Sequence, residues 1–302
     1  MRETSRRLTS LAAQESEGLP KIGLRARHVV EGFLSGLHRG RRFGWNMEFA
    51  GHREYVPGDD LRTLDWKAFA RTDRYFIKRF EEETSLSVTL ALDASGSMGY
   101  ASGQTSKLGF AVELAAALAY LITRQKDQVG LAWFSSQLHG FLPPAGALPH
   151  LRLVWESLEA VQAGGEADYP ANLRAVAGGL PRRGMLILFT DGLTDPELLH
   201  RGLLYFQSRR FDVILLRIVD PAERDFPFRG EYLFTDAETG GRLPVDATGA
   251  RAQYLSALAA HEARLEETAY ELAADYHVLY TDTSVSEALF RLLSRRRRVR
   301  RG

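Results

Sequence analysis

The stretch LSVTLALDASGSM, residues 86–98, constrains the fold of this chain more than any other segment. Its first half is an apolar run rich in Leu and Val, which predicts a buried strand. Its second half is the pattern Asp93-x-Ser95-x-Ser97, and an almost wholly apolar helix is predicted from about Lys107. This order places a carboxylate and two hydroxyls at the carboxyl end of a parallel strand, where α/β sheets bind their ligands.

Beyond residue 86 the chain alternates predicted strands with predicted helices. Short apolar runs predict strands at 86–92, 128–134, 184–190, 212–219 and 276–281. Helical periodicity predicts helices at 107–124, 147–162, 171–179, 195–209, 251–275 and 285–297. The alternation indicates an α/β fold with a mostly parallel sheet and helices on both faces.

Two hairpins interrupt the alternation. The segment 138–142 follows the strand 128–134 too closely for a parallel crossover, so we expect one antiparallel edge strand. Residues 232–235 and 242–245 flank a turn with the sequence ETGG, residues 238–241, which predicts a second hairpin before the long helix.

The remaining segments suggest four parts. We expect a disordered N-terminus at 1–17, because it is polar, and a small cap at 18–85 with a helix at 20–38. The sheet domain is expected at 86–294, and 295–302 form a basic tail.

Composition excludes several classes of protein. The chain has 302 residues and no cysteine, which rules out disulfides, thiolate metal sites and cysteine nucleophiles. A net charge of +1 does not indicate a nucleic-acid partner. No apolar run approaches the about 20 residues that span a bilayer, and no signal-peptide core follows the N-terminus, so we expect a cytoplasmic protein without membrane insertion.

A second predicted strand ends in similar chemistry. The apolar run 184–190 leads into Thr190-Asp191-Gly192, and neighbouring parallel strands would place Asp191 beside Asp93. One or two carboxylates with two hydroxyls suit a hard cation such as Mg²⁺. The alternative is that the two serines cap a helix and Asp191 forms a turn.

Two motifs resemble known families. Asp93-x-Ser95-x-Ser97 with the later Thr190-Asp191-Gly192 is similar to the metal-ion-dependent adhesion site of von Willebrand factor A domains. The preceding segment resembles the bacterial family called domain of unknown function 58, through Glu48-Phe49, Arg53-x-Tyr55-x-x-Gly58-Asp59-Asp60-x-Arg62-x-x-Asp65-Trp66 and Ala70-Arg71.

The resemblance implies a von Willebrand A fold, a Rossmann-like six-stranded sheet with one antiparallel edge strand. It also implies Mg²⁺ held by the serines, by a threonine of a second loop and by the aspartates partly through water, with an open position for a partner's carboxylate. The implied function is a non-enzymatic adaptor that links a MoxR-type AAA+ ATPase to a protein target.

One segment departs from the family pattern. The second loop usually reads Gly-x-Thr-Asp, whereas the matching residues here are Gly165-Glu166-Ala167-Asp168. Ala167 has no oxygen to donate, which predicts weak Mg²⁺ affinity. Asp168 or Glu166 could supply the missing ligand, or the site binds a partner without metal.

The charged residues of the cap have two interpretations. Arg53, Asp59, Asp60 and Arg62 form either an ion-paired network that ties the cap to the sheet or a docking surface for a partner.

Two other functions remain as alternatives. One is a metal-dependent hydrolase using the Asp93 centre, although the chain lacks the Gly-x-Ser-x-Gly and phosphate-loop motifs. The other is binding of nucleic acid or an anionic surface through the arginines of 295–301, which equally fit a solvated helix end.

Overall fold

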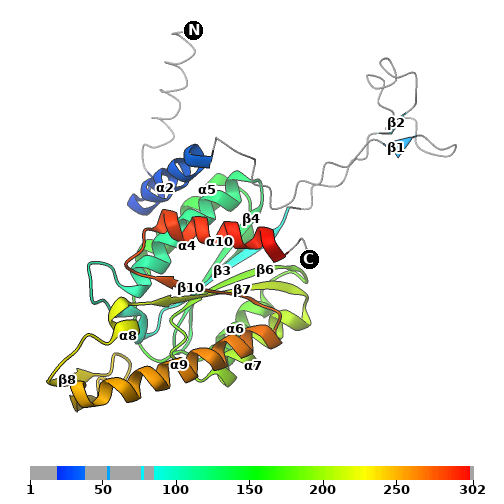
Figure 1. Cartoon of the computed structure of the whole chain (residues 1–302). Helices are drawn as coiled ribbons and strands as arrows, with labels where there is room; N and C mark the ends of the chain where they lie inside the picture. The colour runs from blue at the N-terminus through cyan, green and yellow to red at the C-terminus, as the bar shows by residue number, and fades with distance from the viewer. Residues whose placement is uncertain (1–18, 38–52, 55–75, 78–84, 300–302) are drawn as a thin grey trace, which may run out of the picture. The chain divides into compact units, whose positions relative to one another are not determined.

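The computed structural model describes residues 19–37, 53–54, 76–77 and 85–299 (Figure 1). The chain divides into two units, residues 1–39 with 86–302, and residues 40–85. In the second unit, the described strands β1 (Arg53–Glu54) and β2 (Phe76–Ile77) pair in antiparallel orientation. The first unit contains the sheet and every side chain considered below.

The central sheet has six strands in the order β10-β7-β6-β3-β4-β5. The strands are β3 (Ser87–Asp93), β4 (Gln128–Phe134), β5 (Leu138–Ala145), β6 (Gly184–Thr190), β7 (Phe211–Val219) and β10 (Asp275–Tyr280). Every neighbouring pair is parallel except β4 and β5, which are antiparallel. The predicted α/β sheet with one antiparallel edge strand is therefore confirmed.

Helices cover both faces of this sheet, as expected (Figure 1). One layer contains α2 (Lys21–Leu37), α4 (Lys107–Arg124), α5 (Leu148–Ala160) and α10 (Val285–Val299). The other contains α6 (Tyr169–Gly178), α7 (Pro196–Ser208) and α9 (Ala247–Glu271). Since α4 is apolar almost all round, it is the most deeply buried helix of the first layer.

Three features differ in detail from the expected organisation. Helix α2, predicted as part of the cap at 18–85, packs on α4 and belongs with the sheet unit. The short helices η2 (Gly96–Gly99) and α8 (Pro221–Asp225) were not predicted, because each is about one turn long and gives no periodic signal. Helix α10 continues to Val299, so its backbone extends into the predicted basic tail.

The second hairpin is confirmed. Strands β8 (Glu231–Thr235) and β9 (Arg242–Asp246) pair in antiparallel register, with Thr235 opposite Arg242. The hairpin lies between α8 and α9 in the chain and is separate from the central sheet.

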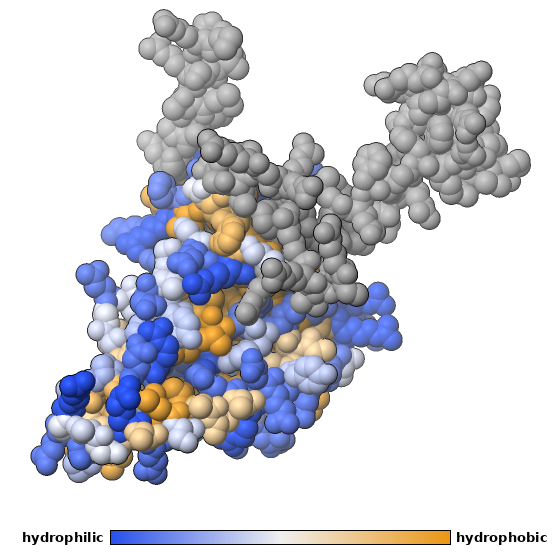
Figure 2. Space-filling view, in the orientation of Figure 1, coloured by the Kyte–Doolittle hydropathy of each residue, from blue (hydrophilic) through white to orange (hydrophobic). Residues whose placement is uncertain are grey.

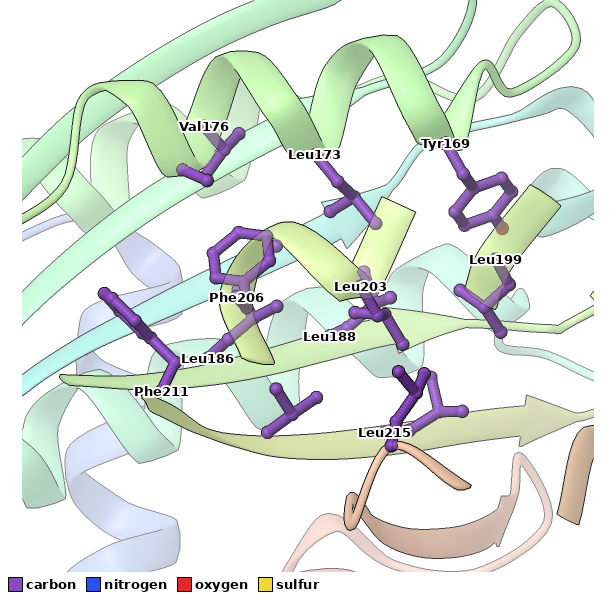
Figure 3. Close-up of a cluster of buried hydrophobic side chains, with 14 of the residues drawn as sticks. Tyr169, Leu173, Val176, Leu186, Leu188, Leu199, Leu203, Phe206, Phe211 and Leu215 are labelled. Carbon is purple, nitrogen blue, oxygen red and sulfur yellow. The ribbon is translucent and has the colours of Figure 1, made fainter. Parts of the chain in front are cut away.

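A buried cluster fixes α6 and α7 on the sheet (Figure 3). The labelled side chains come from α6, from α7 and from strands β6 and β7: Tyr169, Leu173, Val176, Leu199, Leu203, Phe206, Leu186, Leu188, Phe211 and Leu215. Because Tyr169 is the first residue of α6, this packing also sets where its hydroxyl lies.

The surface of the unit is mixed. Figure 2 shows hydrophilic side chains over much of the viewed face, with smaller hydrophobic areas between them.

No helix in the described part of the chain is long and apolar enough to cross a membrane.

The contact between α6 and α7 can be tested at Gly202. A Cβ added there would lie 2.7 Å from Leu173 Cδ1 and 3.0 Å from the Tyr169 carbonyl oxygen. We expect Gly202→Ala to lower the free energy of unfolding by about 1–3 kcal/mol in urea denaturation, because overpacking outweighs the better helix propensity of alanine.

Gly178, the last residue of α6, is the matched control. A Cβ added there would meet no described atom within 4 Å. Gly178→Ala should leave the free energy of unfolding unchanged or slightly raised. Equal destabilisation by the two variants would contradict the close α6–α7 contact.

Candidate functional site

The site begins where two neighbouring strands end. Strands β3 and β6 are adjacent and parallel, with Leu92 opposite Phe189. Asp93 is the last residue of β3 and Thr190 the last of β6, so both lie at the carboxyl edge of the sheet. Asp191 follows directly after Thr190.

Asp93 is fully buried and both of its carboxylate oxygens accept hydrogen bonds. Oδ1 accepts from the Ser95 backbone N–H at 2.8 Å. Oδ2 accepts from the Thr190 hydroxyl at 3.0 Å and from the Tyr169 phenol. The Tyr169 phenol and the Thr190 hydroxyl are also 2.7 Å apart, so these two oxygens and Asp93 Oδ2 form a triangle of hydrogen-bonded atoms.

Burial governs the protonation of this group. Burial and the nearby charge of Asp191 raise the pKa of Asp93 to about 6, although the hydrogen bonds from Tyr169 and Ser95 oppose the shift. Burial and the charge of Asp93 hold the pKa of Tyr169 well above its usual value, so the phenol keeps its proton and donates it.

The two serines of the loop stand side by side. Ser95 Oγ and Ser97 Oγ are 3.1 Å apart, close to the about 3.0 Å that separates adjacent ligands of an octahedral Mg²⁺. The loop is held by the segment before α6, since Gly96 N donates to the Gly165 carbonyl at 2.8 Å and Gly164 N donates to the Ala94 carbonyl at 2.9 Å.

Asp191 pairs with a buried lysine. Lys107, the first residue of α4, has no exposed side-chain area, and its Nζ lies 2.8 Å from Asp191 Oδ2 and also contacts Glu223 of α8. Burial disfavours the ammonium, but the two carboxylates outweigh it and raise the pKa of Lys107. Burial also raises the pKa of Glu223, in spite of this lysine.

A second carboxylate fixes the position of Glu223. Asp220 is the N-cap of α8 and accepts from Ala222 N at 2.8 Å, while its own N–H donates to Glu223 Oε2 at 3.1 Å. Asp220 also accepts from Ser102 N at 2.9 Å, which ties α8 to the loop after η2. Glu223 therefore approaches Lys107 from a rigid capping box.

Asp168 does not join this hydrogen-bonded cluster. It is the N-cap of α6, and its Oδ1 accepts from Ala171 N at 3.0 Å. No hydrogen bond among the described residues links its side chain to Asp93 or to either serine. Tyr169, the next residue, instead places its hydroxyl beside Asp93 and Thr190.

The predicted partner-binding residues are mostly outside the described chain. Asp59, Asp60 and Arg62 lie there, and for Arg53 the structure gives only its place in β1, opposite Ile77. Their role as a docking surface stays a prediction.

The residues that reach the site can hold a cation only through oxygens. Among the described residues, no group of three His, Asp or Glu side chains is arranged to hold a metal ion. The Ser95 and Ser97 hydroxyls, which are hydrogen-bonded to each other at 3.1 Å, have the hard-donor chemistry that Mg²⁺ prefers, and Asp93 lies beside them through its bond from Ser95 N. Ala167 offers no hydroxyl, so water would have to complete the coordination.

The sequence analysis did not identify four residues that belong to this site: Thr190, Glu223, Lys107 and Tyr169. Thr190 was part of the noted Thr-Asp-Gly motif, and Glu223 completes the capping-box pattern Asp220-x-x-Glu223. Lys107 was noted only as the start of an apolar helix, and the sequence analysis did not consider Tyr169. Their partners are between 21 and 116 positions away, and the sequence gives no direct signal of such contacts.

The sheet order and the Asp-x-Ser-x-Ser loop at its carboxyl edge define an α/β domain of the von Willebrand A type. The chain belongs to the family described as protein of unknown function DUF58, which matches residues 51–264. It is 26% identical over 285 residues to uncharacterized proteins of Mycobacterium bovis and Mycobacterium tuberculosis, covering 93% of this chain and 89% of theirs.

Solved structures of low sequence identity are also similar. The conserved hypothetical protein BatB of Bacteroides thetaiotaomicron matches with 16% identity and a TM-score of 0.47, over 70% of this chain and 98% of that one. The SpRpn10 VWA domain matches with 10% identity and a TM-score of 0.39, over 68% of this chain and 94% of that one.

The buried lysine gives a stability prediction. Lys107→Met leaves Asp191 and Glu223 without their buried cation, and we expect the free energy of unfolding to fall by about 3–5 kcal/mol. Lys107→Met with Glu223→Gln should recover part of the loss, because one unpaired charge is removed. Chemical denaturation measures both variants.

The exposed pair Arg152–Glu156 is the control for this measurement. Its side chains are 54% and 48% exposed, so Arg152→Met should change the free energy of unfolding by about 0.5 kcal/mol or less. If Lys107→Met and Arg152→Met lowered the free energy of unfolding by similar amounts, the buried ion pairs of Lys107 would not be important for stability.

The pKa of Asp93 gives a pH prediction for the protein in a chelator. The folded pKa of about 6 lies above the unfolded value of about 3.9, so the folded state binds more protons between these pH values. Stability is therefore lost as pH rises from about 4 to about 6, by about 2–3 kcal/mol from this group.

Asp93→Asn should remove this component. The variant's free energy of unfolding, measured from pH 4 to pH 7, should fall less with pH than that of the wild type, since all other groups titrate in both proteins. Parallel pH profiles would contradict a raised pKa at Asp93.

Proposed function

We propose that this protein is a protein-binding adaptor that captures a carboxylate of its partner through Mg²⁺ held by Ser95 and Ser97. The observation that carries the proposal is the hydroxyl pair, 3.1 Å apart, at a sheet edge that also gathers Asp93 and Asp191. In this proposal the serines bind the cation directly and the two aspartates hold water ligands.

The charge balance supports a bound cation. Asp93, Asp191 and Glu223 lie in one cluster, and Lys107 is the only basic side chain in the described chain that hydrogen bonds join to these carboxylates. With Asp93 ionised the cluster carries an excess of negative charge in a buried setting, which a dication at its surface would compensate.

The same balance supports an acidic partner. Serine hydroxyls are neutral, and Lys107 already neutralises much of Asp191. A cation on the two serines therefore keeps much of its positive charge for a ligand from outside, and a carboxylate is the matching group.

The identity of the partner follows from the family resemblance. The resemblance to domain of unknown function 58 proteins implies a MoxR-type AAA+ ATPase, with this chain linking ATP-driven remodelling to a protein target. The proposal places the protein in the cytoplasm, where such an ATPase has ATP, and describes binding without turnover.

Calorimetry with Mg²⁺ tests the metal part of the proposal. The wild type should bind Mg²⁺, and Ser97→Ala should weaken the Kd about tenfold or more, because a direct oxygen ligand is lost. The control is Ser136→Ala, an exposed serine in the β4–β5 turn, which should leave the Kd unchanged. Equal Kd values for all three proteins would refute the serine site.

Partner binding is tested separately with a purified MoxR-type AAA+ ATPase. Binding should be saturable in Mg²⁺ and should be lost in a chelator or with Ser97→Ala. A panel of phosphatase and esterase substrates should give no turnover. Turnover that depends on Asp93 would instead favour the hydrolase alternative.

A further inference from the structure

We propose that the tip of the β8–β9 hairpin, residues 236–241, covers the cation site and that Glu238 is its internal carboxylate ligand, which an external carboxylate must displace. The inference rests on the proposed function, since it concerns the same site. It adds a residue and a regulatory element that no sequence pattern pointed to.

The tip packs directly on the serine loop. A Cβ added to Gly96 would collide with the Ala237 carbonyl oxygen, so the two backbones are in close contact. Glu238, the next residue, is partly buried, and its carboxylate lies near enough to the Ser97 side chain for that side chain to lower its pKa. Within residues 236–241 only Glu238 is partly buried, and the other five residues are exposed.

The spacing of oxygens suits a shared cation. Ser95 Oγ and Ser97 Oγ are 3.1 Å apart, which is close to the separation of adjacent ligands around an octahedral cation. The contact of Ala237 with Gly96 places Glu238 beside this pair, so in this proposal its carboxylate takes a neighbouring position around the ion.

The tip is rigid enough to aim this side chain. Asp236 Oδ1 accepts from Glu238 N at 2.8 Å and from Thr239 N at 3.0 Å. Asp236 N donates to the Gly241 carbonyl at 2.7 Å, and Gly240 adopts the positive φ of 72° that closes the turn. Glu238 is therefore presented by a fixed turn.

The part of β8 next to the tip is anchored on α9. Phe234 of β8 stacks on Phe226, with ring centroids 6.0 Å apart, and Phe226 stacks on Tyr254 of α9 at 4.4 Å. These aromatic contacts stabilise the hairpin in addition to the hydrogen bonds between its two strands. The strand that leads into the tip is therefore held against α9 by these aromatic rings.

The electrostatic setting calls for a cation between the groups. Asp191, Glu166 and Asp93 are the carboxylates whose charges act on Glu238. A carboxylate held against other carboxylates is unfavourable unless a positive charge lies between them. A dication on the serines would turn this repulsion into attraction.

The expected behaviour is competition between two carboxylates. With Glu238 in place, the position that the proposed function leaves for the partner's carboxylate is filled. A partner that supplies a carboxylate must move the tip, so the affinity for the partner is reduced by the work of displacing Glu238.

Mn²⁺ is the probe, since its effect on water proton relaxation reports how many waters it binds. We expect Glu238→Gln in the full chain to weaken the Mn²⁺ Kd about tenfold and to raise the relaxation enhancement per bound ion, because water replaces the carboxylate. Added acetate should lower that enhancement more in Glu238→Gln than in the wild type.

Glu231→Gln is the matched control. Glu231 is exposed at the start of β8, so this variant removes the same charge from the same hairpin and should keep the wild-type Kd and enhancement. If Glu238→Gln behaves like Glu231→Gln while the wild type binds Mn²⁺, this inference is overturned alone. If the wild type binds no Mn²⁺, the proposed function is overturned with it.

Discussion

The structure of the site depends on how buried carboxylates are kept from destabilising the sheet edge. Asp93 lies at the end of the central strand with no exposed area, and Asp191 and Glu223 are close by. Hydrogen bonds from Tyr169 and Thr190 satisfy the first, and the ammonium of Lys107 satisfies the other two. These partners come from α6, β6 and α4, so the layers on both faces of the sheet contribute to one cluster.

Much of the fold could be predicted because its elements are long and periodic. The predicted strands 128–134 and 184–190 have the same first and last residues as β4 and β6, and the short link after Phe134 identified the antiparallel edge. One-turn elements such as α8 carry no such period. The packing of α2 on α4 was missed as well, since an amphipathic helix shows that it has a partner but not which one.

Part of the site could be predicted because it lies at the ends of long apolar strands. Asp93 and Asp191 could be placed because both follow apolar runs that had to be neighbouring parallel strands. Asp168 was named as a tentative ligand; its Oδ1 accepts from Ala171 N as the N-cap of α6, and its role as a ligand stays a prediction. Lys107 was missed because its ion pairs join distant segments, which a single sequence does not reveal.

Tyr169 connects the site to a surface that is otherwise only packing. Its ring belongs to the cluster between α6 and α7 (Figure 3). Its hydroxyl donates a hydrogen bond to Asp93. Its carbonyl oxygen also lies close to Gly202 of α7, 3.0 Å from where a Cβ on that glycine would stand. Because one residue makes both contacts, the packing of α7 on α6 and the hydrogen bond to the Asp93 carboxylate depend on the position of the same first turn of α6.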